Sequence, residues 1–470
     1  MNSAARLRAL ARQLPEGEFR LDLETRQAHS GDRWYAAQTP DAVGLPESVA
    51  SVSRILAFAA RHRIPVTARG SGYGYVGGCV PSHGGIALSL ARMNRILSIS
   101  PGDFVAVVQP GVITGRLQDA VERRGLYYPP DPASRAECSL GGNIATNAGG
   151  PRCLKYGVTR DYVLGLQVVL SDGSVVRVGS RTHKNKTGFD LHRLFVGSEG
   201  MLGVVTEATL KLIPKPPYRA CLGVGFADMA SAAKAIRRIF KAGFLPSALE
   251  LADTFTLRAA ERRTGSRLLG RCGAHVIVEL DGHRASVCRE LDALAKVLRG
   301  CRPVLLQRGL GDAGCEKFWG LRRQFSNSLR DTGLTKLNED IVVPRSRLED
   351  LFRLTARLQR RHRLPLACFG HAGDGNIHVN VMRDDDDPAQ RERSEACLDD
   401  LFRGVLALGG VITGEHGIGL AKRRWWSDAV SRESRDLHLA IKRALDPAGI
   451  LNPGKFLPDV ASGGRGRSEG

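Results

Sequence analysis

Two histidines in the second half of the chain lie where their ring nitrogens could act together. Period-two alternation along the predicted strand 376–382 puts Asn376, His378 and Asn380 on one face and apolar residues on the other. Such a polar face must meet water, a ligand or a metal ion. His371 precedes the strand in a glycine-rich loop, so the two imidazoles can converge. The pattern indicates a site, with histidines hydrogen-bonded inside a structural loop as the alternative.

A second motif, Glu415-His416, places a carboxylate next to an imidazole between glycines. Two neutral imidazoles, from His371 and His378, and the Glu415 carboxylate suit Zn²⁺ or Mn²⁺ and leave coordination positions open. Such an ion would act as a Lewis acid on a bound hydroxyl group. His416 would then be free to act as a general base, since the pKa of histidine lies near neutral pH.

Three glycine-rich segments lie in the first half, at 69–78, 141–150 and 197–203. The first lets successive backbone N–H groups face a diphosphate, and the second would let a flat ring lie against backbone. The first is not a Rossmann loop, because the chain runs through Pro81 to another strand rather than into a helix. Structural glycine turns and buried small-residue packing are the alternatives to a nucleotide cofactor.

Hydrophobic periodicity and turn residues predict the elements that position these segments. In the first half we expect helices over 47–62 and 114–125, strands over 64–68, 85–90, 104–109 and 203–213, and a hairpin over 164–178. Thr114 is expected to cap its helix. The proline-rich run 214–217 is predicted to separate two domains. Beyond it we expect helices over 231–242, 285–299, 346–362 and 391–408, alternating with strands such as 274–280.

Composition excludes several classes of protein. The 470 residues carry a net charge of +20, but Lys and Arg are spread without a long basic block, so no nucleic-acid partner is expected. The ten cysteines form no C-x-x-C pair, which argues against an iron–sulfur cluster or a zinc ribbon in this chain. There is no apolar stretch typical of a secretory signal or a membrane span. We expect a soluble cytoplasmic protein with free thiols, and peripheral contact with an anionic membrane stays open.

Taken together, the motifs resemble a known family. The loop 69–78, the segment 131–157, the motif at 160–163 and the turn 195–203 are similar to the FAD-binding half of the vanillyl-alcohol oxidase superfamily. Within it they are nearest to the group of the glycolate oxidase flavoprotein subunit, D-lactate dehydrogenase and D-2-hydroxyglutarate dehydrogenase. The closing segment 446–458 matches as well, so the resemblance covers nearly the whole chain.

The resemblance implies an α+β fold. It implies a PCMH-type FAD-binding domain of two α+β subdomains over 1–217 and an α+β substrate cap, an antiparallel sheet with helices, over 218–440. A C-terminal segment, 441–460, would return to the FAD domain, and 461–470 is expected to be a disordered tail. Because positions 71–77 contain no histidine, the FAD is expected to be bound non-covalently.

The expected FAD contacts lie in these motifs. They are Arg69, Gly70, Ser71, Gly72, Tyr73, Gly74, Gly77, Gly78, Pro132, Ser134, Gly141, Gly142, Asn143, Thr146, Asn147, Gly149, Gly150, Gly157, Glu199, Gly200, Gly203, Val204, Val205 and Asn452.

Roles in the second half also follow from the resemblance. It makes His371, His378 and Glu415 metal ligands, His416 the catalytic base and Asn380 a substrate contact.

Cations for an anionic substrate are implied as well. Arg322, in Trp319-Gly-Leu-Arg, matches the family's substrate arginine, whose guanidinium can hold a carboxylate with two hydrogen bonds. Lys336 is a candidate second cation, and Ser326, one helical turn beyond Arg322, is expected to line the pocket.

These expectations define one predicted activity, FAD-dependent oxidation of glycolate, D-lactate or D-2-hydroxyglutarate to the 2-oxo acid. The rivals are a non-redox flavoenzyme similar to alkyl-glycerone-phosphate synthase and a non-catalytic FAD-binding subunit of a glycolate oxidase complex. The pair Glu415-His416 favours the dehydrogenase over the synthase, in which a run of histidines is expected. An electron-transfer flavoprotein, a quinone and an iron–sulfur subunit all stay open as electron acceptors, as does a homodimer.

Overall fold

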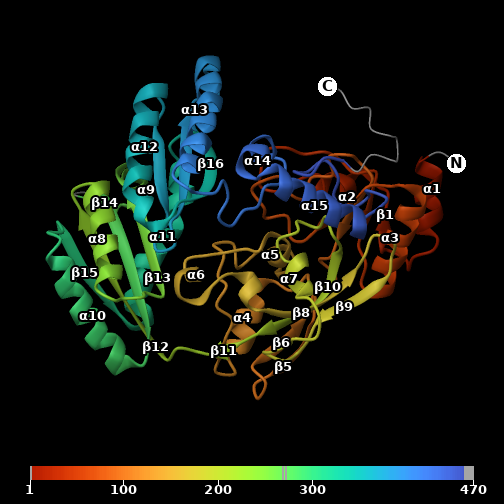
Figure 1. Ribbon diagram of the computed structural model, residues 1–470, viewed down its shortest axis with the longest axis horizontal. Coiled ribbons are helices and arrows are strands. Elements are labelled where there is room, and N and C mark those ends of the chain that lie inside the picture. Colours follow the sequence, from red (N-terminus) through yellow and green to blue (C-terminus); the bar gives the residue numbers. More distant parts are fainter. Residues whose placement is uncertain (1–2, 267–268, 270–271, 460–470) are drawn as a thin grey trace.

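The computed structural model describes residues 3–266, 269 and 272–459. The first lobe contains the N-terminal elements together with the last helices, and the second lobe contains one large sheet with its helices (Figure 1). The chain passes from one lobe to the other between β11 (Ile213–Pro214) and β12 (Tyr218–Phe226), at the proline-rich run. The α+β fold predicted from the sequence is confirmed. The tail predicted over 461–470 lies outside the described residues.

The smaller sheet of the first lobe carries the first glycine segment. Its elements are α1 (Ser3–Ala11), β1 (Phe19–Arg20), α2 (Leu23–Ala28), β2 (Ala42–Gly44), α3 (Val49–His62), β3 (Val66–Arg69) and β4 (Ile86–Ser89), with strand order β1-β2-β4-β3. α3 buries Val52, Ile55 and Leu56 in the same core as Val66 of β3. This packing fixes the end of β3, where the glycine segment begins at Arg69.

A five-stranded antiparallel sheet completes the first lobe. Its elements are β5 (Ile96–Ser100), β6 (Val105–Val108), α4 (Thr114–Glu122), β7 (Leu126–Tyr127), α5 (Leu140–Thr146), α6 (Cys153–Tyr156), η1 (Thr159–Asp161), β8 (Val163–Val169), β9 (Val175–Gly179), α7 (Leu191–Phe195) and β10 (Val204–Lys211). The strand order is β5-β6-β10-β8-β9. The hairpin expected over 164–178 is present as β8 and β9.

Thr114 does not cap its helix. Ile113 occupies the N-cap position without a side-chain hydrogen bond, and α4 begins at Thr114 itself. The hydroxyl group of Thr114 instead donates to the Cys138 carbonyl oxygen and accepts a hydrogen bond from Asn143 Nδ2 at 2.7 Å. The capping prediction was wrong because this buried hydroxyl connects α4 to the second glycine segment.

The second lobe is built on a seven-stranded antiparallel sheet with the order β15-β12-β14-β13-β17-β18-β16. Its further elements are α8 (Met229–Lys241), β13 (Ala248–Asp253), α9 (Thr254–Thr264), β14 (Ala274–Gly282), α10 (Arg284–Arg299), β15 (Leu305–Leu310), α11 (Gly311–Arg330), β16 (Thr335–Val342), η3 (Arg345–Arg347), α12 (Leu348–His362), β17 (Leu366–His371), β18 (Asn376–Arg383) and α13 (Pro388–Ala407).

Helices cover both faces of this sheet. α8, α10, α12 and α13 share one core with it, and α9 and α11 pack on the opposite face. Alternation sends Ile377 and Val379 of β18 into the first core, whereas the ring centroid of His378 lies 5.4 Å from that of Phe369, which belongs to the core on the α9–α11 side. The predicted alternation of the 376–382 strand is therefore observed, and its polar face meets the α11 side.

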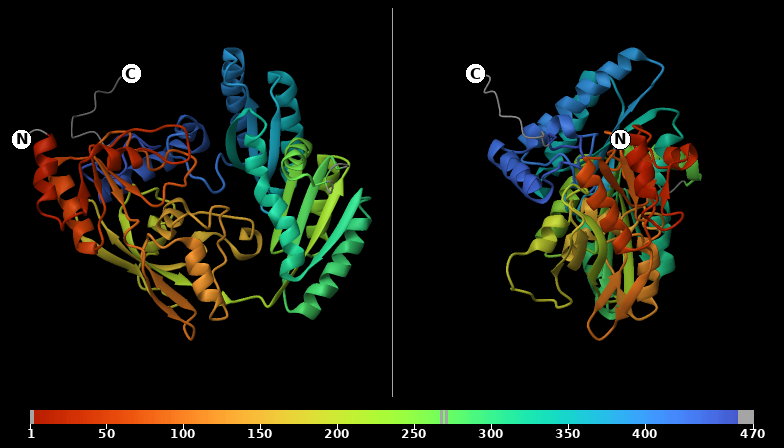
Figure 2. Two further views of the ribbon diagram at one scale, coloured as in Figure 1. Left: turned by 180° about the vertical axis from the view of Figure 1, so that it is seen from behind. Right: turned by 90° about the vertical axis from the view of Figure 1, so that its right-hand side faces the viewer.

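The chain returns to the first lobe before residue 441, where the sequence had placed the boundary. The amides of Ile418 and Gly419 donate to the Glu199 carboxylate at 2.7 and 2.9 Å. α14 (Arg423–Ala429) and α15 (Arg432–Leu445) then lie with the N-terminal elements in Figures 1 and 2. Beyond them Asn452 donates its amide to the Val66 carbonyl at 2.8 Å. Among the described residues, no helix has the length and apolar character needed to cross a bilayer.

Candidate active site

The three predicted metal ligands converge at the polar face of the large sheet. His371 ends β17, His378 lies in β18, and Glu415 lies in the loop before α14. The Nε2 atoms of His371 and His378 lie 3.6 and 3.5 Å from Glu415 Oε1. Ligand atoms placed tetrahedrally about 2.0–2.1 Å from Zn²⁺ are about 3.4 Å apart. This spacing and the donor set fit a divalent cation.

Glu250, in β13, determines which nitrogen His371 offers. Glu250 Oε1 lies 2.7 Å from His371 Nδ1, and Glu250 Oε2 accepts a hydrogen bond from Arg322 Nε at 2.6 Å. Burial alone would raise the pKa of Glu250, but His371 and Arg322 lower it to about 2. An ionised carboxylate only accepts hydrogen bonds, so Nδ1 donates its proton to Glu250, and Nε2, which faces Glu415, is the nitrogen that a metal would take.

Asp340, in β16, holds the loop that carries the other two functional side chains. Its Oδ2 accepts the amide N–H groups of Gly414, Glu415 and His416 at 2.8, 2.8 and 3.0 Å. Its Oδ1 accepts Asn376 Nδ2 at 2.6 Å. Burial raises the pKa of a carboxyl group, but the neighbouring His416 and the backbone donors hold the pKa of Asp340 well below its usual value. One buried anion therefore fixes the backbone of a candidate ligand and of the candidate base.

His416 lies beside the cluster with one nitrogen free. Its ring stacks on His378 with centroids 5.4 Å apart, and its Nε2 lies 3.8 Å from Glu415 Oε1. Its Nδ1 is buried and has no hydrogen-bond partner among the described residues. A partly enclosed imidazole with a free nitrogen has the chemistry of a proton acceptor.

A cavity of about 900 Å³ opens between the lobes at this cluster. Its lining includes Tyr75, Asp131, Pro132, Arg152, Trp319, Arg322, Ser326, Lys336, Asn338, Phe369, His371, His378, Glu415 and His416. Both lobes contribute side chains, so the cavity can bring a cofactor held by one lobe to a substrate held by the other.

The candidate second cation also faces this cavity. Lys336 Nζ donates to Ser326 Oγ at 2.7 Å and forms no ion pair with a described residue. Burial, with a smaller effect of Arg330, lowers the pKa of Lys336 to about 8. A half-buried ammonium group without an acidic partner suits an anionic ligand.

Asn380, the predicted substrate contact, is not part of the cavity lining. It is fully buried, and its Nδ2 donates to the carbonyl oxygens of Ala367 and His378 at 3.0 and 3.2 Å. In this structure it supports β17 and the backbone of a candidate metal ligand.

The three glycine segments contact one another in the first lobe. A Cβ atom on Gly70 would lie 2.3 Å from Ser139 Oγ, and one on Gly150 would lie 2.5 Å from the carbonyl oxygen of Asp131. In the third segment the amide of Gly197 donates to the Ile144 carbonyl at 2.8 Å. The three segments therefore meet in one place with close backbone packing, which fits a cofactor held largely by backbone groups.

The remaining predicted FAD contacts lie in or beside these segments. They are Arg69, Ser71, Gly72, Tyr73, Gly74, Gly77 and Gly78 in the first, Pro132 and Ser134 ahead of the second, Gly141, Gly142, Asn143, Thr146, Asn147, Gly149 and Gly157 in or just after it, Glu199, Gly200 and Gly203 in the third, Val204 and Val205 in β10, and Asn452 in the C-terminal segment.

Some of these side chains bind the protein itself. The Glu199 carboxylate accepts the amides of Ile418 and Gly419. Asn452 Nδ2 donates to the carbonyl oxygens of Gly78 and Glu199 at 3.0 and 2.7 Å. These two residues join the glycine segments to the C-terminal return rather than extending into a cavity.

Two contacts connect the glycine segments to the charged cluster. A Cβ atom on Gly149 would lie 3.1 Å from Glu415 Oε2. The ring centroids of Tyr75, in the first segment, and His416 are 5.5 Å apart. The backbone surface of the first lobe thus directly faces the candidate metal ligands of the second.

Comparison with known families accounts for both lobes. Residues 40–179 match the family described as "FAD binding domain", and residues 215–456 match "FAD linked oxidases, C-terminal domain". The chain belongs to the FAD-linked oxidase family. The predicted family and its FAD cofactor are thereby confirmed.

Relatives of this FAD-linked oxidase carry names that agree with the expected chemistry. The chain is 39% identical to the glycolate oxidase subunit GlcD of Bacillus subtilis over 89% of each chain. It is 37% identical to the GlcD subunit of Escherichia coli, over 90% of this chain and 84% of that one. It is 32% identical to a D-lactate dehydrogenase of Anaerostipes hadrus over 90% of each.

Solved structures show the same fold at low identity. p-Cresol methylhydroxylase aligns with a TM-score of 0.78 and 18% identity, over 98% of this chain and 97% of that one. A 4-ethylphenol oxidase from Gulosibacter chungangensis aligns with a TM-score of 0.78 and 21% identity, over 97% of each. An alkyldihydroxyacetonephosphate synthase aligns with a TM-score of 0.75 and 18% identity, over 97% of this chain and 85% of that one.

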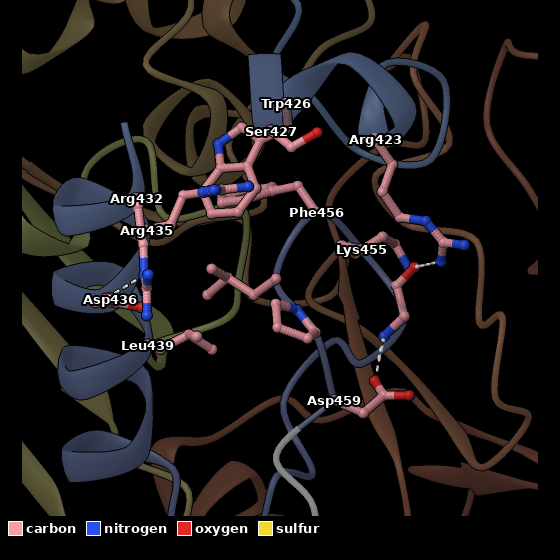
Figure 3. Close-up of a pocket in the computed structure, with 13 residues that line it drawn as sticks. Arg423, Trp426, Ser427, Arg432, Arg435, Asp436, Leu439, Lys455, Phe456 and Asp459 are labelled. Carbon is pink, nitrogen blue, oxygen red and sulfur yellow. Dashed lines mark hydrogen bonds and ion pairs between the residues drawn. The ribbon is translucent and has the colours of Figure 1, made fainter. Parts of the chain in front are cut away.

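A second cavity in this FAD-linked oxidase, of about 590 Å³, lies between α14, α15 and the segment 454–459 (Figure 3). Arg423, Trp426 and Phe456 line it, and Arg423 Nη1 donates to the Gly454 carbonyl oxygen at 2.9 Å (Figure 3). None of the predicted site residues lines it. The candidate catalytic cavity is therefore the one between the lobes.

Sequence reasoning missed Glu250 and Asp340. Glu250 lies between apolar residues in Ala-Leu-Glu-Leu-Ala, and Asp340 directly precedes the apolar run Ile-Val-Val. A carboxylate in a buried strand requires compensating partners, so this pattern could have indicated them.

Proposed function

We propose that this FAD-linked oxidase oxidises glycolate or a small D-2-hydroxy acid such as D-lactate to the 2-oxo acid. D-2-Hydroxyglutarate would require a further cation for its distal carboxylate. The observation that carries the proposal is the position of His416 between Tyr75 of the first glycine segment and the His371, His378 and Glu415 cluster. The names of the relatives, two glycolate oxidase subunits and a D-lactate dehydrogenase, support this substrate class.

Oxidation of a hydroxy acid removes the hydroxyl proton and transfers the α-hydrogen as a hydride. Bound FAD supplies the hydride acceptor, and a divalent cation, Zn²⁺ or Mn²⁺, would polarise the substrate oxygen. His371, His378 and Glu415 would hold that cation. His416, which lines the cavity, would accept the hydroxyl proton.

Orientation of the substrate would come from the cations of the cavity. Arg322 has its Nε engaged by Glu250, which leaves its terminal nitrogens to pair with the substrate carboxylate. Lys336, with Ser326, would receive a second polar group or the same carboxylate. Asn380 would act through β17 rather than by direct contact.

The FAD is proposed to be non-covalent. Cys153, beside Gly149, is the nearby thiol, and a Cβ atom on Gly149 would lie 3.6 Å from its Sγ. Burial and then Asp131 raise the pKa of Cys153 well above its usual value, so its thiol stays protonated and unreactive.

Anaerobic reduction of the purified yellow protein tests the proposal. We expect the flavin absorbance to bleach with glycolate or D-lactate and much more slowly with L-lactate. A chelator should slow the bleaching, and its rate should recover on adding back Zn²⁺ or Mn²⁺. If no 2-hydroxy acid bleaches the flavin, the proposed activity is wrong. If bleaching is unchanged after complete metal removal, the metal role is wrong.

The same measurement separates this activity from a synthase-like reaction without net redox. That alternative has the same fold in its favour. A synthase-like enzyme would not be bleached by hydroxy acids. Because two relatives are named subunits, we further propose that the electrons pass to another subunit or carrier, such as an electron-transfer flavoprotein, a quinone or an iron–sulfur subunit.

A further inference from the structure

Glu250 is a buried charge between apolar neighbours in β13. Its neighbours Leu249 and Leu251 enter the main core of the second lobe, and Glu250 itself is 1% exposed on the opposite face. An ionised carboxylate in such a place is strongly destabilising unless all of its lone pairs are compensated. The hydrogen-bond partners of Glu250 therefore explain how an ionised carboxylate is tolerated at this buried position.

The two oxygens of Glu250 have different partners from different elements. Oε1 contacts Nδ1 of His371, at the end of β17, at 2.7 Å, and Oε2 contacts Nε of Arg322, on α11, at 2.6 Å. One side chain is a candidate metal ligand and the other the candidate anchor for the substrate carboxylate. Both are almost fully buried, with side-chain exposures of 7% and 11%.

We propose that Glu250 is a positioning residue that couples the cation site to the substrate-carboxylate site. The proposal rests on the function proposed above. By accepting from Nδ1, Glu250 orients the His371 ring so that Nε2 faces Glu415. By accepting from Nε, it orients the guanidinium of Arg322 so that the terminal nitrogens stay available.

Sharing one carboxylate makes the two sites interdependent. If the His371 ring is held in its ligating orientation, the same carboxylate is held in the position that Arg322 requires. Coupling between two binding events is reciprocal, so the cation should tighten anion binding by the factor by which the anion tightens cation binding. Removing the shared carboxylate should weaken this mutual effect and leave only the part that comes from direct contact between the cation and the anion.

Glu250→Gln is the informative change. Glutamine keeps the size of the side chain, but it has only one acceptor oxygen, and its NH₂ group would face an N–H donor of either His371 or Arg322. Either Arg322 loses its acceptor, or His371 changes tautomer and presents a protonated Nε2 to the metal site. Replacing a group that orients a metal-ligating histidine typically weakens metal binding by about 10–100-fold.

Asp253→Asn is the matched control. Asp253 ends the same strand and is half-buried, but it caps α9 through the Thr256 amide and accepts the Cys368 amide of β17. Its replacement perturbs the same two strands without touching His371 or Arg322. A second variant, Arg322→Lys, removes the Nε donor to Glu250 and leaves the contact between Glu250 and His371 in place.

The experiment measures two equilibria on the FAD-bound protein. The first is the retention of Zn²⁺ or Mn²⁺ in buffers of graded free metal, read as metal content. The second is the binding of oxalate, which has no α-hydrogen to lose, read from the flavin spectrum with and without metal. We expect Glu250→Gln to weaken metal retention about 10–100-fold and Asp253→Asn to change it less than about threefold.

Oxalate binding provides the decisive comparison. In the unaltered protein metal should tighten it, both by direct contact with the anion and through Glu250, so in Glu250→Gln and Arg322→Lys the metal-dependent gain should be clearly smaller than in the unaltered protein and in Asp253→Asn. Arg322→Lys should still retain metal within about threefold of the unaltered protein. Unchanged metal retention in Glu250→Gln, or an equal loss in Asp253→Asn, would overturn the inference. If the unaltered protein retains no metal, the inference and the metal role both fail, whereas bleaching by hydroxy acids would still test the proposed oxidation separately.

Discussion

The two lobes prepare their parts of the active site by different physical means. In the first lobe the site is made of backbone, and a single added Cβ atom on Gly70 or Gly150 would lie 2.3 or 2.5 Å from a neighbouring atom. In the second lobe the site is made of charged side chains, and the buried carboxylates of Glu250 and Asp340 hold them in place. The first-lobe surface depends on the absence of side-chain atoms at its glycines, and the second-lobe site depends on pairs of oppositely charged side chains.

This difference predicts that the two kinds of damage are separable. Extra volume in the first lobe should weaken FAD retention, because the glycine segments can no longer approach one another. Removing a functional side chain of the second lobe should leave the FAD bound but slow its reduction by the substrate. Because Gly149 faces Glu415 directly, the two surfaces meet without an intervening layer.

His416→Ala should give the largest effect, on the second-lobe side of the comparison. Loss of a general base typically slows the chemical step about 10²–10⁴-fold. The loop should survive, because Asp340 binds the backbone amide of residue 416, which alanine keeps. Stopped-flow reduction by D-lactate or glycolate measures the rate, and the flavin content measures the fold.

His438→Ala is the control for that change. His438 lies on α15, bonds the Ser434 carbonyl at 2.7 Å and is outside the cavity between the lobes. The flavin of the His438→Ala variant should be reduced at the same rate as in the unaltered protein. Rapid flavin reduction in His416→Ala would remove His416 as the base.

Gly150→Ala should damage the first lobe instead. The new Cβ atom would meet the carbonyl oxygen and carbon of Asp131 at 2.5 and 2.7 Å, and backbone cannot rotate away as a side chain can. Overpacking of this kind costs about 1–3 kcal/mol, and a cost carried by the FAD-bound state alone would weaken FAD retention by at most about 5–150-fold. Flavin content after dialysis measures it. Gly102→Ala, which has no atom within 4 Å of its new Cβ, should keep its flavin, and normal retention in Gly150→Ala would contradict the assignment.

The sequence predicted the glycine-rich segments of the first half and the charged cluster of the second half better than it predicted individual side-chain contacts. Period-two alternation placed His378 on the polar face of its strand, because strand geometry is local. Glu250 and Asp340 were missed because their partners, His371 and Glu415, are 121 and 75 residues away along the chain. Only the pairing of β13 with β17 and the fold of the loop before α14 bring them together.

The direction in which a side chain points, and therefore its role, could not be predicted from the sequence either. Asn380 shares the predicted polar face with His378, yet it is buried against the Ala367 carbonyl and does not line the cavity. Glu199 lies in a glycine segment, yet its carboxylate binds the returning C-terminal chain. A motif indicates which residues gather, whereas neighbouring strands and loops decide which of them face the open space.

The smallest expected effect tests whether charge in the second lobe also acts on the substrate. Burial lowers the pKa of Lys336 to about 8, so its ammonium is present below that pH and is lost as the pH rises through it. A carboxylate substrate stays ionised throughout, so the KM should rise above about pH 8, by at most about tenfold per pH unit. Lys336→Met should give a high KM without this inflection, whereas Lys336→Arg, which keeps its charge, should give a flat profile near the low value. An inflection near pH 8 that persists in Lys336→Met would assign the titration to another group and leave Lys336 without contact to the substrate.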